Sequence, residues 1–289
     1  MAPSRNTAVV TGGNSGIGFE TSRALARLGW RVVMTGRSAE RLAAAREAIR
    51  RETAADIDTA VGDFASLASV RALARRLGAE PRIDVLLNNA GIALATRRTT
   101  ADGFDMMVQV NHLAPYLLTR LLLPRLVASA PARIVVVASR AHFGAKSFGF
   151  DDFQFERSYD LVEAYARTKL YNLLFARELA RRLAGTGVTA NALHPGEIRT
   201  RIGLDGDFAG PLQLLIRFAH LFMRPQSEGA KVTTYVATAA ELAGVSGQYF
   251  TTDLKAEQPS QLALSDAGAR QLWEISAGLV GLPGDEPLA

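Results

Sequence analysis

The tyrosine and the lysine of the segment YARTK, residues 165–169, have the spacing of an acid–base pair. The surrounding residues 161–183 have a helical pattern, and positions i and i+4 of a helix share one face. A phenol ionises at about pH 10, and a fixed ammonium group beside it favours the phenolate and lowers that pKa. Such a pair can exchange a proton near neutral pH, although this spacing also arises by chance.

Ser139 is a candidate partner for this pair. It follows the β-branched run at 134–137, at the point where a strand would carry its hydroxyl into a ligand crevice. A serine at this position can also be purely structural.

A glycine-rich stretch near the N-terminus indicates a phosphate site. The sequence TGGNSGIG, residues 11–18, lies between an apolar, β-forming stretch at 7–10 and a helical pattern at 19–28. Free N–H groups and the dipole at a helix start attract phosphate, and glycine allows it to approach closely. The glycines at 12, 16 and 18 do not follow the commonest GxGxxG spacing, and a tight turn without a ligand is the alternative.

Further polar residues follow other predicted strands. Arg37 stands where an acid would bind the ribose 2′-hydroxyl of NAD, and an arginine there would pair with the 2′-phosphate of NADP. It could equally be a surface arginine that opens a basic helix. Asp63 could accept a hydrogen bond from the adenine amino group or cap the next helix. The segment NNAG, residues 88–91, could lie against a nucleotide or form a simple turn.

Alternating strand and helix patterns must position these residues. We expect helices at 19–28, 39–51, 67–77, 104–128 and 161–183, with possible kinks at Pro115 and Pro124. We expect strands at 7–10, 31–34, 59–61, 84–87, 134–137, 188–193 and 247–250. This order predicts an α/β fold, a single-domain Rossmann-type doubly wound parallel sheet of about seven strands with helices on both faces. Ligands would bind at the carboxyl ends of the strands, and one domain would span residues 1–289.

Composition excludes several classes of protein. Hydrophobic residues make up 48% of the 289, so a large core is expected, and the absence of cysteine excludes disulfides and thiolate metal sites. The net charge is +5, but acidic residues interleave with the basic ones, so we expect solvated helix faces and no nucleic-acid partner. The four histidines lack metal-site spacing, and no apolar run is long enough to span a membrane. We therefore expect no metal and a cytoplasmic location.

Taken together and in this order, the motifs closely resemble the short-chain dehydrogenase/reductase family. The matching elements are TGGNSGIG, NNAG, Asn111, Ser139, YARTK and HPGEIRT, and the resemblance covers roughly residues 5–255. The segments ADGFDMMVQVNHLAPYLLT, SAPARIVVVASRAH and GTGVTANALHPG are similar to the retinol dehydrogenase and WW-domain oxidoreductase branch. The resemblance implies hydride transfer between a nicotinamide cofactor and a carbonyl or alcohol, and Gly36 and Arg37 favour NADP(H) over NAD(H) as that cofactor. We also expect a homo-oligomer, either a dimer or a tetramer.

The resemblance also implies a role for each matching residue. Tyr165 would exchange the proton with the substrate oxygen, while Lys169 would lower the tyrosine pKa and hold the nicotinamide ribose. Ser139 would hydrogen-bond the carbonyl, and Asn111 would hold a water in a proton relay to Lys169. The expected cofactor-binding residues are Gly12, Asn14, Ser15, Gly16, Ile17, Gly18, Arg37, Asp63, Phe64, Asn89, Ala90, Gly91, Tyr165, Lys169, Pro195, Gly196, Ile198 and Thr200.

The departures from the family pattern are modest. Gly13 replaces the commoner alanine, Thr168 replaces the serine usual before the lysine, and Arg140 follows Ser139 where a second serine is frequent. The membrane anchor typical of animal retinol dehydrogenases is not seen, which weakens the case for retinoids themselves.

The apolar segment 199–228 is expected to form a mobile lid over a bulky, mostly apolar substrate. Packing on the core, on a second subunit or on a membrane surface are the alternatives for this segment. The alternative function is an NADP-binding sensor or scaffold without turnover. The complete set of tyrosine, lysine, serine and asparagine argues against that alternative.

Overall fold

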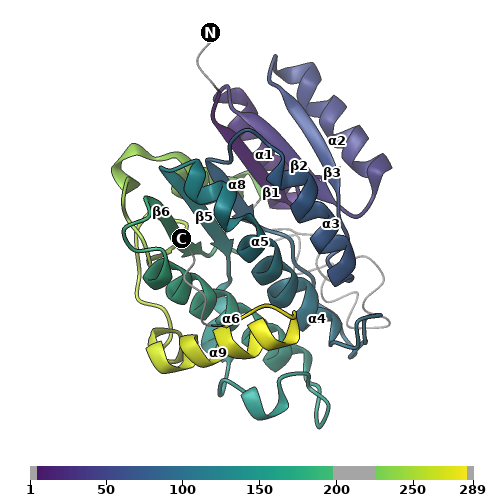
Figure 1. Ribbon diagram of the computed structural model, residues 1–289, viewed down its shortest axis with the longest axis vertical. Helices are drawn as coiled ribbons and strands as arrows, with labels where there is room; N and C mark the ends of the chain where they lie inside the picture. The colour runs from purple at the N-terminus through teal and green to yellow at the C-terminus, as the bar shows by residue number, and fades with distance from the viewer. Residues whose placement is uncertain (1–4, 198–224, 285–289) are drawn as a thin grey trace.

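The strands expected from the sequence all form, and they are joined into one parallel sheet (Figure 1). The computed structural model describes residues 5–197 and 225–284. The sheet has the order β3-β2-β1-β4-β5-β6-β7. The chain adds β2 and β3 on one side of β1, then crosses back and adds β4 to β7 on the other side. The strands are β1 (Thr7–Thr11), β2 (Arg31–Gly36), β3 (Ile57–Val61), β4 (Val85–Asn88), β5 (Ala132–Val137), β6 (Val188–Leu193) and β7 (Tyr249–Phe250).

Helices cover both faces of the sheet because successive strand residues point to opposite sides. Ala8 and Val10 belong to one buried cluster and Val9 to the other. The first cluster packs against α1 (Gly16–Arg27), α2 (Ala39–Glu52) and α8 (Gln226–Thr238). The second cluster packs against α3 (Leu67–Gly78), α5 (Ala114–Ala128) and α6 (Leu161–Arg182), with α9 (Asp266–Leu279) beside α6 in Figure 1. The predicted fold class is confirmed.

The helix expected at 104–128 is divided into three parts. A single turn, α4 (Met106–Val108), leads into a π-helical turn, η1 (Gln109–Leu113), and then into α5. The carboxylate of Asp105 accepts the backbone N–H of Val108 at 2.9 Å and so marks where the helix begins. The π turn is a difference from the expected regular helix, and such turns are frequent at functional sites.

Helix α9 lies beyond the last predicted element and closes the outer side of α6. Trp273 is 1% exposed and meets the ring of Tyr116 edge-on, with 5.0 Å between centroids. The guanidinium groups of Arg120 and Arg182 lie over the indole, 4.8 Å and 4.5 Å from its centroid. Aromatic and cation–π contacts therefore add to the apolar burial that holds this helix.

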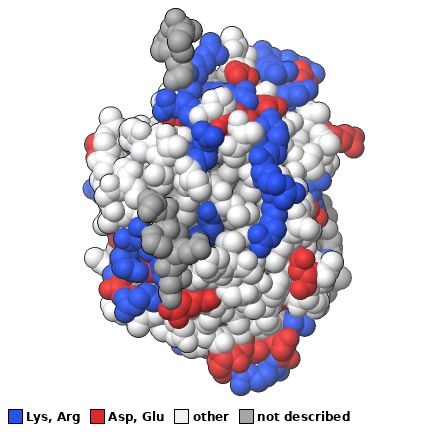
Figure 2. Space-filling view, viewed as in Figure 1, with Lys and Arg blue, Asp and Glu red and all other residues white. Residues whose placement is uncertain are grey.

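Many basic side chains on the surface are paired with acids. Arg31 contacts Asp56, Asp58 and Glu80, and Arg76 contacts the last two of these. Figure 2 shows Lys and Arg side chains with Asp and Glu beside many of them on the face in view. Within the described ranges, no helix is both long enough and apolar enough to cross a bilayer.

The two tryptophans offer a test of how much the α9 contact contributes. Trp273→Ala should lower the free energy of unfolding by about 3–5 kcal/mol, the usual cost of deleting a buried aromatic ring. Trp30→Ala removes a partly exposed ring and should cost clearly less. Urea unfolding followed by far-ultraviolet circular dichroism measures both, and an equal loss in the two variants would contradict this account.

Candidate active site

The glycine-rich stretch forms the turn between β1 and α1. Gly12 and Gly16 have φ of 65° and 60°, in the left-handed region that favours glycine. A Cβ on Gly18 would lie 2.3 Å from the carbonyl oxygen of Gly12, so only glycine fits at position 18 in the first turn of α1. The helix begins at Gly16, three residues earlier than predicted, with no acid in its first turn and no side-chain cap from Ser15. The positive helix end is therefore available for an anion.

Thr11 joins this turn to the loop that follows β4. Its Oγ1 accepts the backbone N–H groups of Asn89 at 2.9 Å and Ala90 at 3.1 Å, and it donates to the carbonyl of Leu87 at 3.2 Å. The Asn89 amide donates in turn to the Thr11 carbonyl at 2.8 Å. Thr11 is not among the residues that the sequence predicts for the site. Its signal is its place at the head of the TGG motif, at the end of a strand that pairs with β4.

The end of β2 presents Arg37 to solvent. A Cβ on Gly36 would lie 2.7 Å from Oδ1 of Asn14, so this glycine makes room for the asparagine side chain. Arg37 is exposed, and no acidic residue pairs with it in the described parts of the chain. Within the described residues, the guanidinium of Arg37 is therefore unpaired. Arg37 follows Gly36, which packs against Asn14 of the glycine-rich turn.

Asp63 and Phe64 follow β3, where Asp63 lies in the loop and the side chain of Phe64 packs in the core. The carboxylate of Asp63 accepts the N–H of Ala65 at 3.0 Å. The N-cap of α3 is Ser66, which accepts the N–H of Ser69, so Asp63 does not cap this helix. The Phe64 side chain is 6% exposed and belongs to the core, and its carbonyl accepts from the Gln109 amide.

The acid–base residues meet at the carboxyl end of β5. The hydroxyl of Ser139 interacts with the phenol of Tyr165 and favours its ionised form. The Nζ atom of Lys169 lies 5.5 Å from the centroid of the tyrosine ring and donates to the carbonyl of Val137 at 3.3 Å. The i, i+4 geometry expected within α6 brings Tyr165 and Lys169 together, and the end of β5 supplies Ser139.

Burial controls the protonation of this pair. Loss of solvation raises the pKa of Tyr165 to about 12, although the hydrogen bond with Ser139 opposes that rise. Burial lowers the pKa of Lys169 to about 8. The pKa of Tyr165 is therefore raised because desolvation of the phenolate outweighs the contribution of Ser139, and the expected lowering by Lys169 stays a prediction.

Asn111 lies in the π turn, fully buried, and connects the β4 loop with α6. Its amide accepts the N–H of Ile92 at 2.8 Å and donates to the Ile92 carbonyl at 2.9 Å and to Thr168 Oγ1 at 3.1 Å. Thr168 then donates to the carbonyl of Tyr165 at 2.9 Å, so the threonine keeps the hydroxyl function of the usual serine. Both amide hydrogens of Asn111 are used, and the water relay to Lys169 stays a prediction.

Gly91 and Gly13 fit tightly at this edge of the sheet. A Cβ on Gly91 would lie 3.3 Å from the Asn111 amide oxygen and 3.5 Å from the Lys169 ammonium. A Cβ on Gly13 would lie 2.9 Å from the side chain of Met34 in β2, which accounts for glycine where the family commonly has alanine.

The HPG segment follows β6 on the same edge. Pro195 is buried, and Gly196 has φ of 97° and donates its N–H to Nδ1 of His194 at 3.3 Å. Ile198 and Thr200 lie outside the described residues. So does the expected lid at 199–228, except for residues 225–228, where α8 begins.

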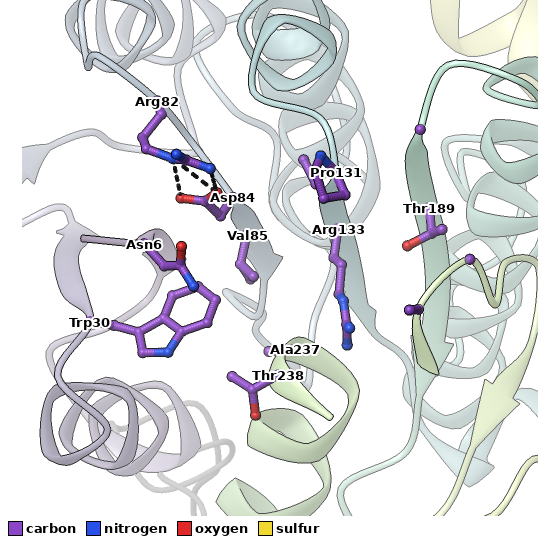
Figure 3. A pocket seen from close by; sticks show the side chains of 14 residues that line it. Asn6, Trp30, Arg82, Asp84, Val85, Pro131, Arg133, Thr189, Ala237 and Thr238 are labelled. Atoms are coloured by element: carbon purple, nitrogen blue, oxygen red, sulfur yellow. Dashed lines mark hydrogen bonds and ion pairs between the residues drawn. The ribbon is translucent and has the colours of Figure 1, made fainter. Parts of the chain in front are cut away.

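A hollow of about 270 Å³ lies at the opposite edge of the sheet, near the starts of β1, β4, β5 and β6 (Figure 3). Arg82 and Asp84 point toward each other there and form an ion pair. Arg133 donates to the carbonyls of Val236 and Ala239 at the C-terminal end of α8. Since ligands of such sheets bind at the carboxyl edge, we place the active site with Tyr165 instead.

A tyrosine–lysine pair and a glycine-rich turn that share one edge of a parallel sheet are typical of dinucleotide-dependent oxidoreductases. The short chain dehydrogenase family matches residues 6–205, and the chain belongs to this family, whose members bind nicotinamide cofactors. The chain is 45% identical to human retinol dehydrogenase 14, covering 96% of this chain and 86% of that protein. It is 43% identical to human retinol dehydrogenase 13, covering 96% and 85%. The predicted resemblance to the retinol dehydrogenase branch is confirmed.

Solved structures agree with this assignment. An uncharacterised protein from Mycobacterium paratuberculosis has a TM-score of 0.77 and 31% identity, covering 98% of this chain and 96% of that one. A short-chain dehydrogenase from Sphingobium yanoikuyae in complex with NADPH has a TM-score of 0.64 and 25% identity, covering 80% and 84%.

Gly18→Ala tests the glycine turn. The added methyl group would press on the Gly12 carbonyl and displace the turn, so we expect NADPH to bind about ten- to hundredfold more weakly. The matched control is Gly278→Ala in α9, where a Cβ meets nothing within 4 Å. Fluorescence titration measures binding, and thermal unfolding separates a binding defect from a folding defect. Unchanged affinity in Gly18→Ala would contradict a close approach of the ligand to this turn.

Proposed function

We propose that the protein is an NADP(H)-dependent oxidoreductase that interconverts a lipophilic carbonyl compound and the corresponding alcohol, with Tyr165 as the general acid and base. The observation that carries this proposal is the Ser139–Tyr165–Lys169 cluster at the sheet edge that also holds the glycine turn. A sensor that binds the cofactor without turnover requires no such cluster.

Tyr165 is suited to donate a proton to a carbonyl oxygen. Because its pKa is raised to about 12, the phenol is fully protonated at neutral pH. The N–H of Ala141 donates to Ser139 Oγ at 3.2 Å, which leaves the serine hydrogen for the phenol or for the substrate oxygen. Hydrogen bonds aimed at an oxygen that gains charge are an effective form of catalysis.

Lys169 is suited to hold a ribose hydroxyl and to stabilise the phenolate left after proton transfer. Its ammonium group makes one hydrogen bond within the described structure, to the Val137 carbonyl, and has further hydrogens to donate. The bound nicotinamide cofactor supplies or accepts the hydride.

The preference for NADP(H) rests on Gly36 and Arg37. The position after β2 carries no acid that would repel a 2′-phosphate, and the exposed guanidinium of Arg37 offers a planar fork that matches phosphate oxygens. The NADPH complex of the Sphingobium yanoikuyae relative supports this choice.

An apolar substrate is supported by the surroundings of the acid–base pair and by the relatives. Phe143 is 52% exposed and lies four residues after Ser139, and Val162 is 69% exposed and lies three residues before Tyr165. Exposed apolar side chains near a reacting centre favour lipophilic ligands. The relatives are named for retinol, a lipophilic alcohol. We propose terpenoid, polyketide, steroid or retinoid carbonyls as the substrate class.

Tyr165→Phe should abolish most turnover and leave NADPH binding largely intact, because it deletes the acid–base hydroxyl and keeps the ring. Lys169→Ala should damage both, since the ammonium group serves the ribose and the tyrosine. Stopped-flow absorbance at about 340 nm follows NADPH oxidation, and fluorescence titration follows binding. Turnover close to wild type in Tyr165→Phe would defeat this mechanism.

Arg37→Ala should lower kcat/KM for NADPH by about ten- to hundredfold and change that for NADH little, because a charge-assisted hydrogen bond contributes about 1.5–3 kcal/mol. Arg51→Ala, an exposed arginine at the far end of α2, is the matched control. Steady-state kinetics with both cofactors measure the ratio. A wild-type preference for NADH would sink this role of Arg37.

A further inference from the structure

A buried histidine joins the catalytic serine to a distant part of the chain. His142 lies in the 3₁₀ helix η2 (Arg140–Gly144) and is 0% exposed. Its Nδ1 atom lies 2.6 Å from the carbonyl oxygen of Ser139. The backbone N–H of Ser260 donates to its Nε2 atom at 3.1 Å. One imidazole thus contacts two segments that are far apart in sequence.

The two contacts fix the tautomer of this ring. A carbonyl oxygen only accepts hydrogen bonds, so Nδ1 carries the hydrogen, and Nε2 accepts the Ser260 N–H and so carries none. Burial lowers the pKa of His142, which keeps the ring neutral at neutral pH. The ring of Tyr249 meets it edge-on, with 5.3 Å between centroids, and holds its orientation.

The segment that supplies Ser260 is itself built onto the sheet. The N–H of Glu257 donates to the carbonyl of Tyr249 in β7 at 2.8 Å, and the Thr251 hydroxyl donates to the Glu257 carboxylate at 3.0 Å. The chain then reaches the 3₁₀ helix η5 (Gln261–Leu264), of which Ser260 is the N-cap. This segment therefore presents the Ser260 N–H from a fixed support.

We propose that His142 is a positioning residue, which transmits the placement of the 255–264 segment to Ser139 and so sets the aim of the catalytic hydroxyl. The inference rests on the proposed function, because it assigns Ser139 to the reacting oxygen. The short bond to the Ser139 carbonyl restrains the same residue whose Oγ meets Tyr165. Small displacements of a catalytic group lower the rate strongly.

Ser260 provides a matched pair of variants. Ser260→Pro deletes the N–H that donates to His142, and the φ of −60° at this position is one that proline adopts. Ser260→Ala keeps the N–H and removes a hydroxyl that has no partner in the described structure. We expect Ser260→Pro to lower kcat about tenfold with little change in KM for NADPH, and Ser260→Ala to match the wild type.

A second pair changes the ring itself. His142→Asn places an amide near the position of Nδ1 and can still donate to the Ser139 carbonyl, whereas His142→Phe keeps a ring without nitrogen. We expect the asparagine variant to retain more of kcat than the phenylalanine variant. Circular dichroism and thermal unfolding identify any variant that fails to fold. If a His142 variant fails to fold, the comparison of kcat between Ser260→Pro and Ser260→Ala tests the proposal.

Nitrogen-15 NMR of the histidine side chains gives a readout that does not depend on activity. The wild type should show the neutral Nδ1–H tautomer for His142, assigned by its loss in His142→Asn, and Ser260→Pro should weaken that preference. An Nε2–H tautomer, or equal kcat in Ser260→Pro and Ser260→Ala, overturns this inference and leaves the proposed function standing. A wild-type protein without turnover on lipophilic carbonyls overturns the proposed function instead.

Discussion

The hydroxyl of Thr11 fastens the two loops on which the site is built. At the point where the sheet reverses its order, β1 and β4 end side by side, and each continues into a loop that lacks regular backbone pairing. The threonine oxygen accepts two N–H groups from the β4 loop while its own hydrogen goes to Leu87. Leaving such donors unpaired near the core costs about 1–3 kcal/mol each. The glycine turn, Asn89 and Gly91 all take their positions from this fastening.

At the same edge of the sheet, burial shifts the pKa values of two ionisable side chains. Tyr165 and Lys169 lose solvation together, and their pKa values move apart, to about 12 for the tyrosine and about 8 for the lysine. The phenol stays protonated at neutral pH, and the ammonium group gives up its proton more readily than that of an exposed lysine. Asn111 binds Thr168, which in turn binds the carbonyl of Tyr165 in α6. These bonds hold the backbone of the helix turn that carries Tyr165 and Lys169.

Sequence patterns predicted the strands well because a parallel sheet buries continuous apolar runs that local composition reveals, as at Ile134 to Val137. The spacing of Tyr165 and Lys169 on one helix face was equally readable. The pKa of Tyr165 was not, because it depends on burial contributed by the whole fold. The π turn at Asn111 and the capping of α3 by Ser66 instead of Asp63 depend on tertiary contacts that a local pattern does not contain. Helix α9 had readable signals, an N-cap serine at 265 and apolar residues at helical spacing.

The placement of α9 has a consequence for biosynthesis. Every described strand of the sheet has been made once Phe250 is synthesised. The side chains that contact Trp273, those of Tyr116, Arg120 and Arg182, are still uncovered at that moment. A nascent chain that has completed its sheet therefore exposes an apolar and basic surface until about two dozen more residues leave the ribosome, and exposed apolar surface of this kind is what chaperones bind. Docking of α9 is thus the step that covers this surface in a newly made molecule.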